Sequence, residues 1–161
     1  MVGSECRTRA ISPLESGAPL ETSLTVLGHT GFTAYTGMVH IGDVGHHDVV
    51  YVSAAAGGVG SCAVQFAKAR GATVFGSAGS DEKVSLIVDV LGADGAVNRR
   101  DDSALELLQG LAPDGITLYD DNVGGEQLEA ALEWLQVGGR VVACGAFSQG
   151  PTRADRPTTV G

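Results

Sequence analysis

A glycine-rich turn carries the strongest chemical signal in the sequence. An apolar run, VVYVS, leads into Ala55-x-Gly57-x-x-Gly60, and a helical pattern follows. Glycine at position 57 lets the backbone approach a pyrophosphate, and glycine at position 60 lets the helix pack closely on the strand. The free N–H groups and the dipole at the helix start, around Gly58 and Val59, attract phosphates. The usual fingerprint has glycine in place of Ala55, but the strand–turn–helix context favours a dinucleotide site over a turn without a ligand.

Small polar residues and cations follow the second predicted strand. An NAD site places Asp or Glu about 20 residues after the glycine turn, and here that count arrives at Ser77, shortly before Gly79. Lys83 lies one turn into the next helix, and Arg99 and Arg100 follow the neighbouring third strand. Small residues with cations accommodate a 2′-phosphate, which a carboxylate would repel. The pattern favours NADP(H), while the two acidic residues just before Lys83 leave NAD open.

Two more strand ends offer groups to the same ligand, because ligands bind beyond the carboxyl ends of an open parallel sheet. Asn122 follows the fourth strand in YDDNVGG, where its carboxamide can bond a ribose or a nicotinamide. Cys144, Gly145 and Ala146 follow the fifth strand. We expect backbone N–H and C=O groups of Gly145 and Ala146 to face the nicotinamide. We expect Cys144 to pack there without acting as a nucleophile, since no histidine is near it in the sequence.

The elements that position these residues alternate regularly along the chain. Strands are expected at Val49–Ser53, Thr73–Gly76, Ala96–Asn98, Ile116–Asp120 and Arg140–Cys144. Helices are expected at Val59–Arg70, Asp81–Leu91, Ser103–Leu111 and Glu126–Leu135, the third opened by a Ser103–Glu106 capping box. Two short helices with a glycine joint are expected over 23–39. Apolar strands joined by helices predict an α/β fold, a Rossmann-like doubly wound parallel sheet of order 3-2-1-4-5 with helices on both faces.

Composition narrows the class of protein. The chain has 161 residues, 43% hydrophobic and 18% charged, which is typical of one globular domain. We expect a lead-in segment over 1–22 with a short strand near 7–11, a nucleotide-binding domain over 23–149, and a loose tail over 150–161. Ten Lys and Arg against 19 Asp and Glu give a net charge of −9, which argues against nucleic acid and anionic membranes as partners. Without a long apolar run or a signal-peptide pattern, a cytoplasmic location is expected.

The sequence shows no metal-binding pattern. Its three cysteines, Cys6, Cys62 and Cys144, are far apart and form no Cys-x-x-Cys motif. His46 and His47 are adjacent in a polar segment and are expected to be solvated turn residues. We therefore expect no metal site.

Five linked motifs carry a family resemblance. LGHTGFTAY, SAAAGGVGS, GSAGSDEK, DNVGG and CGAFSQ occur in order between about Leu24 and Gln149. The chain resembles the zinc-independent medium-chain dehydrogenases/reductases, and within them the prostaglandin reductase (leukotriene B4 12-hydroxydehydrogenase) and alkenal double-bond reductase group. This resemblance implies an NADPH-dependent enzyme that reduces the C=C bond of an α,β-unsaturated ketone or aldehyde. Hydride goes to the β-carbon, and the α-carbon is then protonated.

The resemblance also implies roles for single residues. Gly57 and Gly60 fall on the pyrophosphate turn, and Lys83 falls on the lysine that binds the 2′-phosphate. Thr33 and Tyr35 fall in the TAY segment at the rim of the cofactor cleft. Arg99 stands where family members often carry a tyrosine. We name no certain proton donor, and Tyr35 is a weak candidate for a catalytic role.

Family enzymes are roughly twice this length, with a substrate domain before the nucleotide domain and a sixth strand after it. The cofactor site is therefore nearly complete here, whereas the substrate site is mostly absent. An enone reductase with uncertain activity of its own is the leading hypothesis. A non-catalytic dinucleotide-binding module and a repurposed interaction fold derived from such a reductase remain alternatives. The open edge of the fifth strand can pair with a second copy, so a homodimer is also expected.

Overall fold

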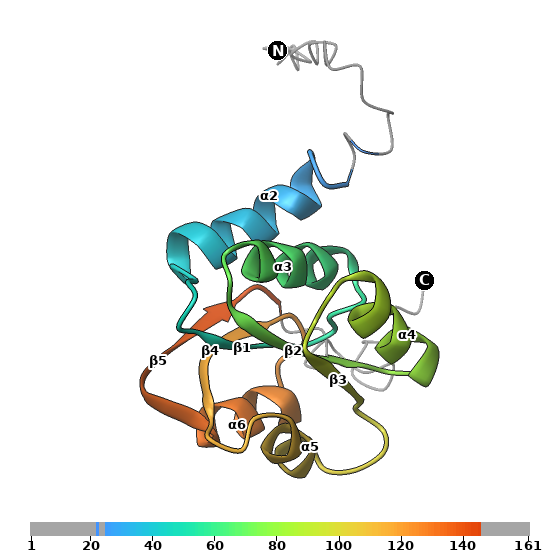
Figure 1. Cartoon of the computed structure of the whole chain (residues 1–161), viewed down its shortest axis with the longest axis vertical. Helices are drawn as coiled ribbons and strands as arrows, with labels where there is room; N and C mark the ends of the chain where they lie inside the picture. The colour runs from blue at the N-terminus through green and yellow to red at the C-terminus, as the bar shows by residue number, and fades with distance from the viewer. Residues whose placement is uncertain (1–21, 23–24, 146–161) are drawn as a thin grey trace, which may run out of the picture.

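The chain folds around one parallel sheet. The computed structural model describes residue 22 and residues 25–145 (Figure 1). The strands are β1 (Val49–Val52), β2 (Thr73–Ala78), β3 (Gly95–Asn98), β4 (Ile116–Asp121) and β5 (Leu135–Ala143). All neighbouring strands are parallel, in the order β3-β2-β1-β4-β5. The predicted fold class and strand order are therefore confirmed, whereas the expected strand near 7–11 and the tail over 150–161 lie outside the described residues.

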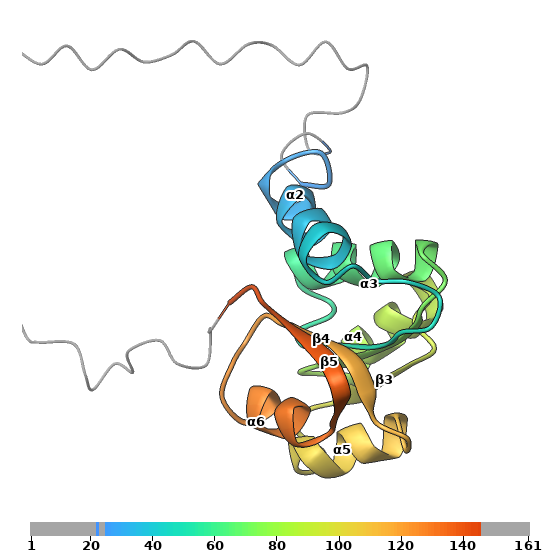
Figure 2. The same cartoon turned by 90° about the vertical axis from the view of Figure 1, so that its left-hand side faces the viewer.

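Helices cover both faces of the sheet (Figures 1 and 2). The α-helices are α2 (His29–Tyr35), α3 (Gly58–Ala69), α4 (Asp81–Ser85), α5 (Ala104–Leu111) and α6 (Glu126–Glu133), and two π-helical segments are η1 (Thr36–Ile41) and η2 (Leu86–Val90). Helices α2, α3 and α4 lie on one face, and α5 and α6 lie on the other. Ser103 caps α5 as predicted, with its hydroxyl accepting from the Glu106 N–H.

The alternation of side chains along β1 builds two cores. Val50 and Val52 face α3 and are fully buried in one apolar cluster. Tyr51 faces the opposite side and is buried with Leu108 of α5 and Ala131 of α6. Successive strand residues point to opposite faces, so one short apolar strand serves both layers.

The strand order of the sheet also determines where a ligand crevice can form. The chain leaves β1 to build β2 on one side, and β4 pairs with β1 on the other. Val52 lies opposite Gly76 in β2 and opposite Asp120 in β4, so the three carboxyl ends meet. In a doubly wound sheet such a switch point opens a crevice between the two helical layers.

The N-terminal helix differs from its prediction. Instead of two helices joined at a glycine, α2 begins after Gly28 and continues directly into η1. Gly31 lies inside the helix, where a Cβ would overlap the backbone carbonyl of Val26. Its N–H donates to the Thr25 carbonyl at 3.1 Å. The glycine therefore serves the close approach of the preceding turn and does not act as a joint.

The ends of two other elements also differ. The helix expected over Asp81–Leu91 becomes π-helical after Ser85, with the Leu91 N–H bonded to the Leu86 carbonyl. Helix α6 ends at Glu133, and β5 already begins at Leu135. The strand expected over Arg140–Cys144 therefore starts earlier, and a register shift against β4 lies between its residues Leu135 and Arg140.

Trp134 explains the early end of α6. Its indole Nε1 donates to the Ala112 carbonyl at 2.7 Å, and its carbonyl accepts from the Ile116 N–H at 3.1 Å. These tertiary bonds bring the chain alongside β4, and the helix ends two residues before Leu135, where the sequence predicted its end.

Candidate functional site

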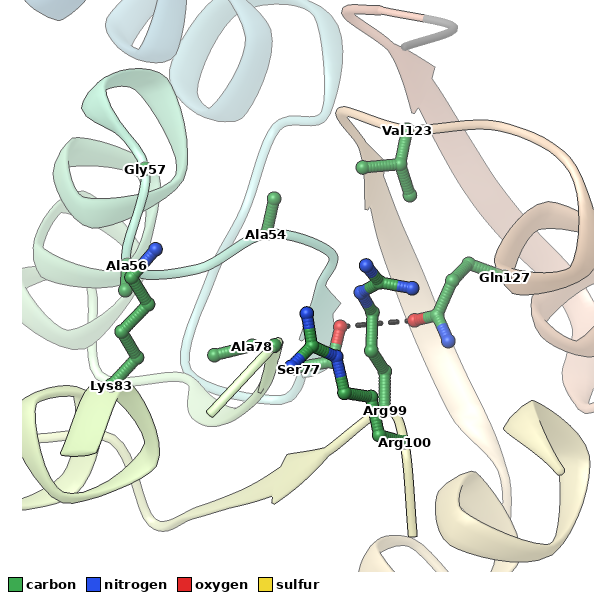
Figure 3. Close-up of a pocket in the computed structure, with 11 residues that line it drawn as sticks. Ala54, Ala56, Gly57, Ser77, Ala78, Lys83, Arg99, Arg100, Val123 and Gln127 are labelled. Atoms are coloured by element: carbon green, nitrogen blue, oxygen red, sulfur yellow. Dashed lines mark hydrogen bonds between the residues drawn. The ribbon is translucent and has the colours of Figure 1, made fainter. Parts of the chain in front are cut away.

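A pocket of about 320 Å³ opens at the carboxyl ends of the central strands (Figure 3). It brings together five of the residues that the sequence predicted, Gly57, Ser77, Gly79, Lys83 and Arg99. Six further residues complete its wall, namely Ala54, Ala56, Ala78, Arg100, Val123 and Gln127. We call it the cation pocket, for its three basic side chains.

The three cations of this pocket have no carboxylate partner in the described part of the chain. Lys83 comes from α4, whereas Arg99 and Arg100 come from the turn after β3. Across residues 25–145, none of the three forms an ion pair. The nearby Asp81 carboxylate accepts instead from the Asn98 side chain at 2.8 Å and does not line the pocket. In a chain with net charge −9, this local excess of positive charge favours an anionic ligand.

The glycine turn beside the pocket has the predicted close packing. A Cβ at Gly60 would lie only 2.9 Å from the Ala55 Cα, so helix α3 and the turn can meet only at a glycine. Gly57 is the N-cap of α3, and its N–H donates to the Ala54 carbonyl at 2.8 Å. The next three N–H groups, those of Gly58, Val59 and Gly60, lie in the first turn, and the helical pattern of bonds begins with the Ser61 N–H donating to the Gly57 carbonyl at 2.9 Å. This end of α3 can therefore bind phosphate oxygens.

The alanine that replaces the first fingerprint glycine fits for a specific reason. Ala55 is fully buried, and its methyl group faces β2 at Gly76. A Cβ added at Gly76 would lie 2.7 Å from the Ala55 Cβ. The missing side chain in β2 thus makes room for the methyl group in the turn. The strained residue is its neighbour Ala54, which has a φ of 50°.

A buried hydrogen-bond network forms the floor of the pocket. The Gln127 side-chain oxygen, Oε1, accepts from the Tyr51 hydroxyl at 2.7 Å and from the Ser77 hydroxyl at 2.9 Å. Burial raises the pKa of Tyr51 to about 12, so this hydroxyl keeps its proton and donates at neutral pH. Sequence reasoning missed Gln127, because its position in α6 does not indicate that its side chain bonds Tyr51 and Ser77 of the sheet.

The predicted residue after β4 is engaged with the protein. The Asn122 side-chain nitrogen donates to the Ser53 carbonyl at 3.0 Å and to the Asp120 carboxylate at 2.9 Å. Asp120 is buried, and burial raises the pKa of its carboxyl group. Asn122 does not line the cation pocket, and within residues 25–145 its side-chain oxygen, Oδ1, accepts no hydrogen bond.

The residues after β5 are also engaged with the protein. Burial and the charge of Asp120 raise the pKa of Cys144 to about 12, so the thiol stays protonated and packs as predicted. The Gly145 N–H donates to the Asp121 carbonyl at 2.9 Å. The loop after β4 therefore already uses this N–H, and the expectation that Gly145 faces the nicotinamide stays a prediction. Ala146 lies outside the described residues.

The two predicted residues of α2 lie away from the cation pocket. The Thr33 hydroxyl donates to the His29 carbonyl within its own helix, at 2.8 Å. The Tyr35 ring is 42% exposed and makes edge contacts with His40 and Phe66. Helix α2 approaches the glycine turn through Thr30, whose methyl group would lie 3.1 Å from a Cβ at Gly58. Tyr35 therefore gains no support as an acid from its placement.

Comparison with known proteins adds a family. The family model described as zinc-binding dehydrogenase matches residues 58–160. The chain is 46% identical over 132 residues to prostaglandin reductase 1 of Mus musculus, covering 81% of this chain and 40% of that protein. It is 41% identical over 136 residues to 2-alkenal reductase (NADP(+)-dependent) of Nicotiana tabacum, covering 84% and 40%.

A solved structure agrees with these relatives. CurA from Vibrio vulnificus in complex with NADPH matches with a TM-score of 0.77 at 38% identity, over 80% of this chain and 38% of that chain. The chain thus spans about 40% of the length of the curated relatives that it matches.

The family description mentions zinc, and the described residues do not fit a zinc site. Within residues 25–145, no three His, Cys, Asp or Glu side chains gather in a way that could hold a metal ion. The same part of the chain contains no helix with the length and apolar character of a membrane span. On the family match, the sequence identities and the shared fold, this chain belongs to the zinc-binding dehydrogenase family, within the medium-chain dehydrogenases/reductases.

Proposed function

We propose that residues 23–149 form the NADP(H)-binding domain of a zinc-independent reductase. Its substrates would be α,β-unsaturated ketones and aldehydes, and the reaction would add hydride to their C=C bond. The observation that carries the proposal is the cation pocket beside the glycine turn. The names of two relatives, an NADP(+)-dependent 2-alkenal reductase and a CurA structure with NADPH, support the same cofactor and substrate class.

The charges of the pocket favour NADPH over NADH. The 2′-phosphate distinguishes the two nucleotides, and Lys83, Arg99 and Arg100 lie around the end of β2, where the ribose of a dinucleotide binds. None of these cations has an internal ion pair within residues 25–145, so none must be released before it binds a phosphate. The acids that would serve NAD, Asp81 and Glu82, do not line the pocket.

The residues of the chain bind and orient the cofactor in this proposal. The cofactor, when bound, supplies the hydride that reaches the β-carbon of the substrate. The start of α3 would hold the pyrophosphate, and the cations would hold the 2′-phosphate. The Asn122 side-chain oxygen, which has no partner within residues 25–145, would accept from the ribose or nicotinamide.

Parallel titrations with NADPH and NADH test the cofactor. We expect micromolar NADPH binding with at least about a tenfold preference over NADH, which corresponds to about 1.4 kcal/mol. Calorimetry or nicotinamide fluorescence would measure both. Equal affinity for the two nucleotides would contradict the 2′-phosphate assignment, and binding of neither would remove the proposed function.

A non-catalytic dinucleotide-binding module is the second candidate. The observation in its favour is that Tyr35 and Cys144, two titratable groups considered at the site, do not line the cation pocket. The oxidation of NADPH by an alkenal, followed by absorbance at saturating cofactor, separates the candidates. Turnover would support the reductase, and tight binding without turnover would support the module.

We also infer a homodimer and a cytoplasmic location. Within the described residues β5 lies at the edge of the sheet, and its Val137 side chain is fully exposed. Such an edge can pair with the same strand of a second copy. Light scattering coupled to size exclusion would give the mass, and Val137→Lys should shift a dimer toward the monomer. A monomer at high protein concentration would contradict the dimer.

A further inference from the structure

Gln127 is a polar residue of the pocket to which the proposed cofactor contacts give no role. It is 8% exposed, yet it lines the cation pocket. Within residues 25–145 its side-chain nitrogen, Nε2, has no hydrogen-bond partner, and no buried side-chain nitrogen or oxygen there lacks one. The nitrogen is therefore the accessible part of an otherwise buried side chain, and it is accessible from the pocket.

The amide is held in one orientation by two buried donors. Tyr51 and Ser77 are each 1% exposed, and both donate to the Gln127 Oε1 atom. Turning the amide away would leave both hydroxyls without this acceptor, and a buried polar group without a hydrogen bond is unfavourable. The Tyr51 ring is itself held by stacking on Tyr119, at 5.6 Å between ring centres. The pocket thus contains a fixed N–H donor that the described part of the chain does not use.

The position of Gln127 indicates which part of a dinucleotide it meets. In Figure 3, Lys83, Ala56 and Gly57 lie on one side of the pocket, whereas Val123 and Gln127 lie on the other. Phosphates belong to the first side, with its ammonium group and the start of α3. The second side offers an apolar surface and one amide donor, which suits a flat base with ring-nitrogen acceptors. Arg99 and Arg100 lie between them, and guanidinium planes stack on such rings.

We propose that Gln127 recognises the base of the bound dinucleotide, its Nε2 group donating a hydrogen bond to a ring nitrogen of adenine. Adenine carries acceptor nitrogens on its edges, so a donor with fixed direction orients the ring. Tyr51 and Ser77 act as positioning residues, because they hold the amide without touching the base. This assignment rests on the proposed function, since it requires that the pocket bind a dinucleotide.

Replacing Gln127 by methionine tests the contact. A base contact is common to NADPH and NADH, so Gln127→Met should weaken both by the same factor, about three- to tenfold. Its effect should also appear with 2′,5′-ADP, which carries the base without the nicotinamide. The matched control is Lys83→Met, which should weaken NADPH and leave NADH unchanged. Fluorescence or calorimetric titration of the full chain gives each dissociation constant.

A second set of variants covers the case in which Gln127→Met folds poorly. Tyr51→Phe with Ser77→Ala removes both donors and leaves the amide free to rotate. Gln127→Met added to that pair leaves no buried hydroxyl of the network without an acceptor. We expect the double variant to bind both nucleotides more weakly than the wild type and more tightly than the triple variant.

The outcomes separate this assignment from the proposed function. Equal weakening of NADPH and NADH in the Gln127 variants supports the base contact. A loss confined to NADPH would place the amide on the 2′-phosphate and overturn it, and unchanged binding of both would overturn it too. In these cases the wild type still binds NADPH and the proposed function stands. A wild type that binds neither nucleotide overturns both proposals.

Discussion

The two ends of the sheet use their basic residues in opposite ways. At the amino end, Arg140 of β5 pairs with Asp48 at 2.8 Å and donates to the Gly42 carbonyl at 2.7 Å. Arg70, after α3, donates to the Val44 carbonyl at 3.0 Å. At the carboxyl end, the three cations of the cation pocket form no ion pair within residues 25–145. Residues of the same charge thus stabilise one end of the fold and are left available at the other.

Asp48 is a charged residue whose carboxylate is bound by several donors of the protein itself. Its carboxylate accepts from the Gly45 N–H, from the Thr117 hydroxyl and from Arg140, all within 2.8 Å. The residue is 9% exposed and links the start of β1 to Thr117 of β4 and Arg140 of β5. The comparison teaches that a cation is a candidate for ligand binding only once its internal partners are known.

The largest expected effect is on stability at the amino end. Asp48→Ala leaves Arg140 and Thr117 without their shared acceptor, and we expect a loss of about 3 kcal/mol in the free energy of unfolding. Urea denaturation measures it. The matched control is Asp43→Asn, which removes a carboxylate that is 87% exposed and 3.9 Å from Arg70. Asparagine tolerates the positive φ of this position, so the change should cost under about 0.5 kcal/mol. Equal losses in the two variants would show that the three bonds to Asp48 add no measurable stability.

The next effect is on binding at the carboxyl end. Lys83→Met should weaken NADPH about tenfold, or about 1.4 kcal/mol, with little change in unfolding, because no internal ion pair is lost. Lys68→Met is the matched control. Lys68 pairs with Asp94 at 2.7 Å, so its loss should cost up to about 1 kcal/mol of stability and leave NADPH affinity unchanged. A large loss of stability in Lys83→Met, or a loss of NADPH affinity in Lys68→Met, would contradict the contrast between the two ends of the sheet.

A smaller effect comes from backbone strain, which each end carries at one residue. Ala54 has a φ of 50° in the glycine turn, and Asp43 has a φ of 43° in the loop before β1. Ala54→Gly should raise the melting temperature by relieving about 1 kcal/mol of left-handed strain. Asp43→Gly should change it little, because aspartate tolerates this conformation. A drop in stability for Ala54→Gly would mean that glycine's greater freedom in the unfolded chain outweighs the strain.

The smallest effect concerns pH. Burial alone would raise the pKa of Asp48, but hydrogen bonds from Thr117, Gly45 and its arginine partner outweigh burial and hold the pKa below 3.8. A lowered pKa in the folded state adds stability above the unfolded pKa, and this is lost as pH falls through the folded value. Unfolding free energies measured from pH 6 to pH 3 should therefore fall less for Asp48→Asn than for the wild type. If stability fell equally with pH in both proteins, Asp48 would not contribute to the loss of stability in acid.

Sequence reasoning located the main parts of the site because their signals are local. The spacing from Gly57 to Gly60 follows from the steric demands of a strand–turn–helix, and it predicted the close packing at Gly60. Lys83 was found by counting along β2 to the next helix. Arg100 was noted only as a cation after the third strand, although its side chain lines the same pocket as Arg99.

Other features could not be found in this way, because they depend on partners far along the chain. Gln127 reaches the pocket through Tyr51 and Ser77, which precede it by 76 and 50 residues. The early end of α6 depends on the bonds of Trp134 to the loop before β4. The Gly145 N–H is expected to face a ligand, and within the fold it donates to the Asp121 carbonyl.

The sequence by itself determined the alternating elements, the strand order and the glycine turn, since periodicity and steric limits act over a few residues. Only the tertiary structure decided which charged and polar groups are free. Whether Asn122, Asp81 or Lys83 can bind a ligand depends on whether a neighbouring element already bonds it. These bonds form only when distant segments of the chain meet at the ends of the sheet. A group that is already hydrogen-bonded within the fold is not available to a ligand.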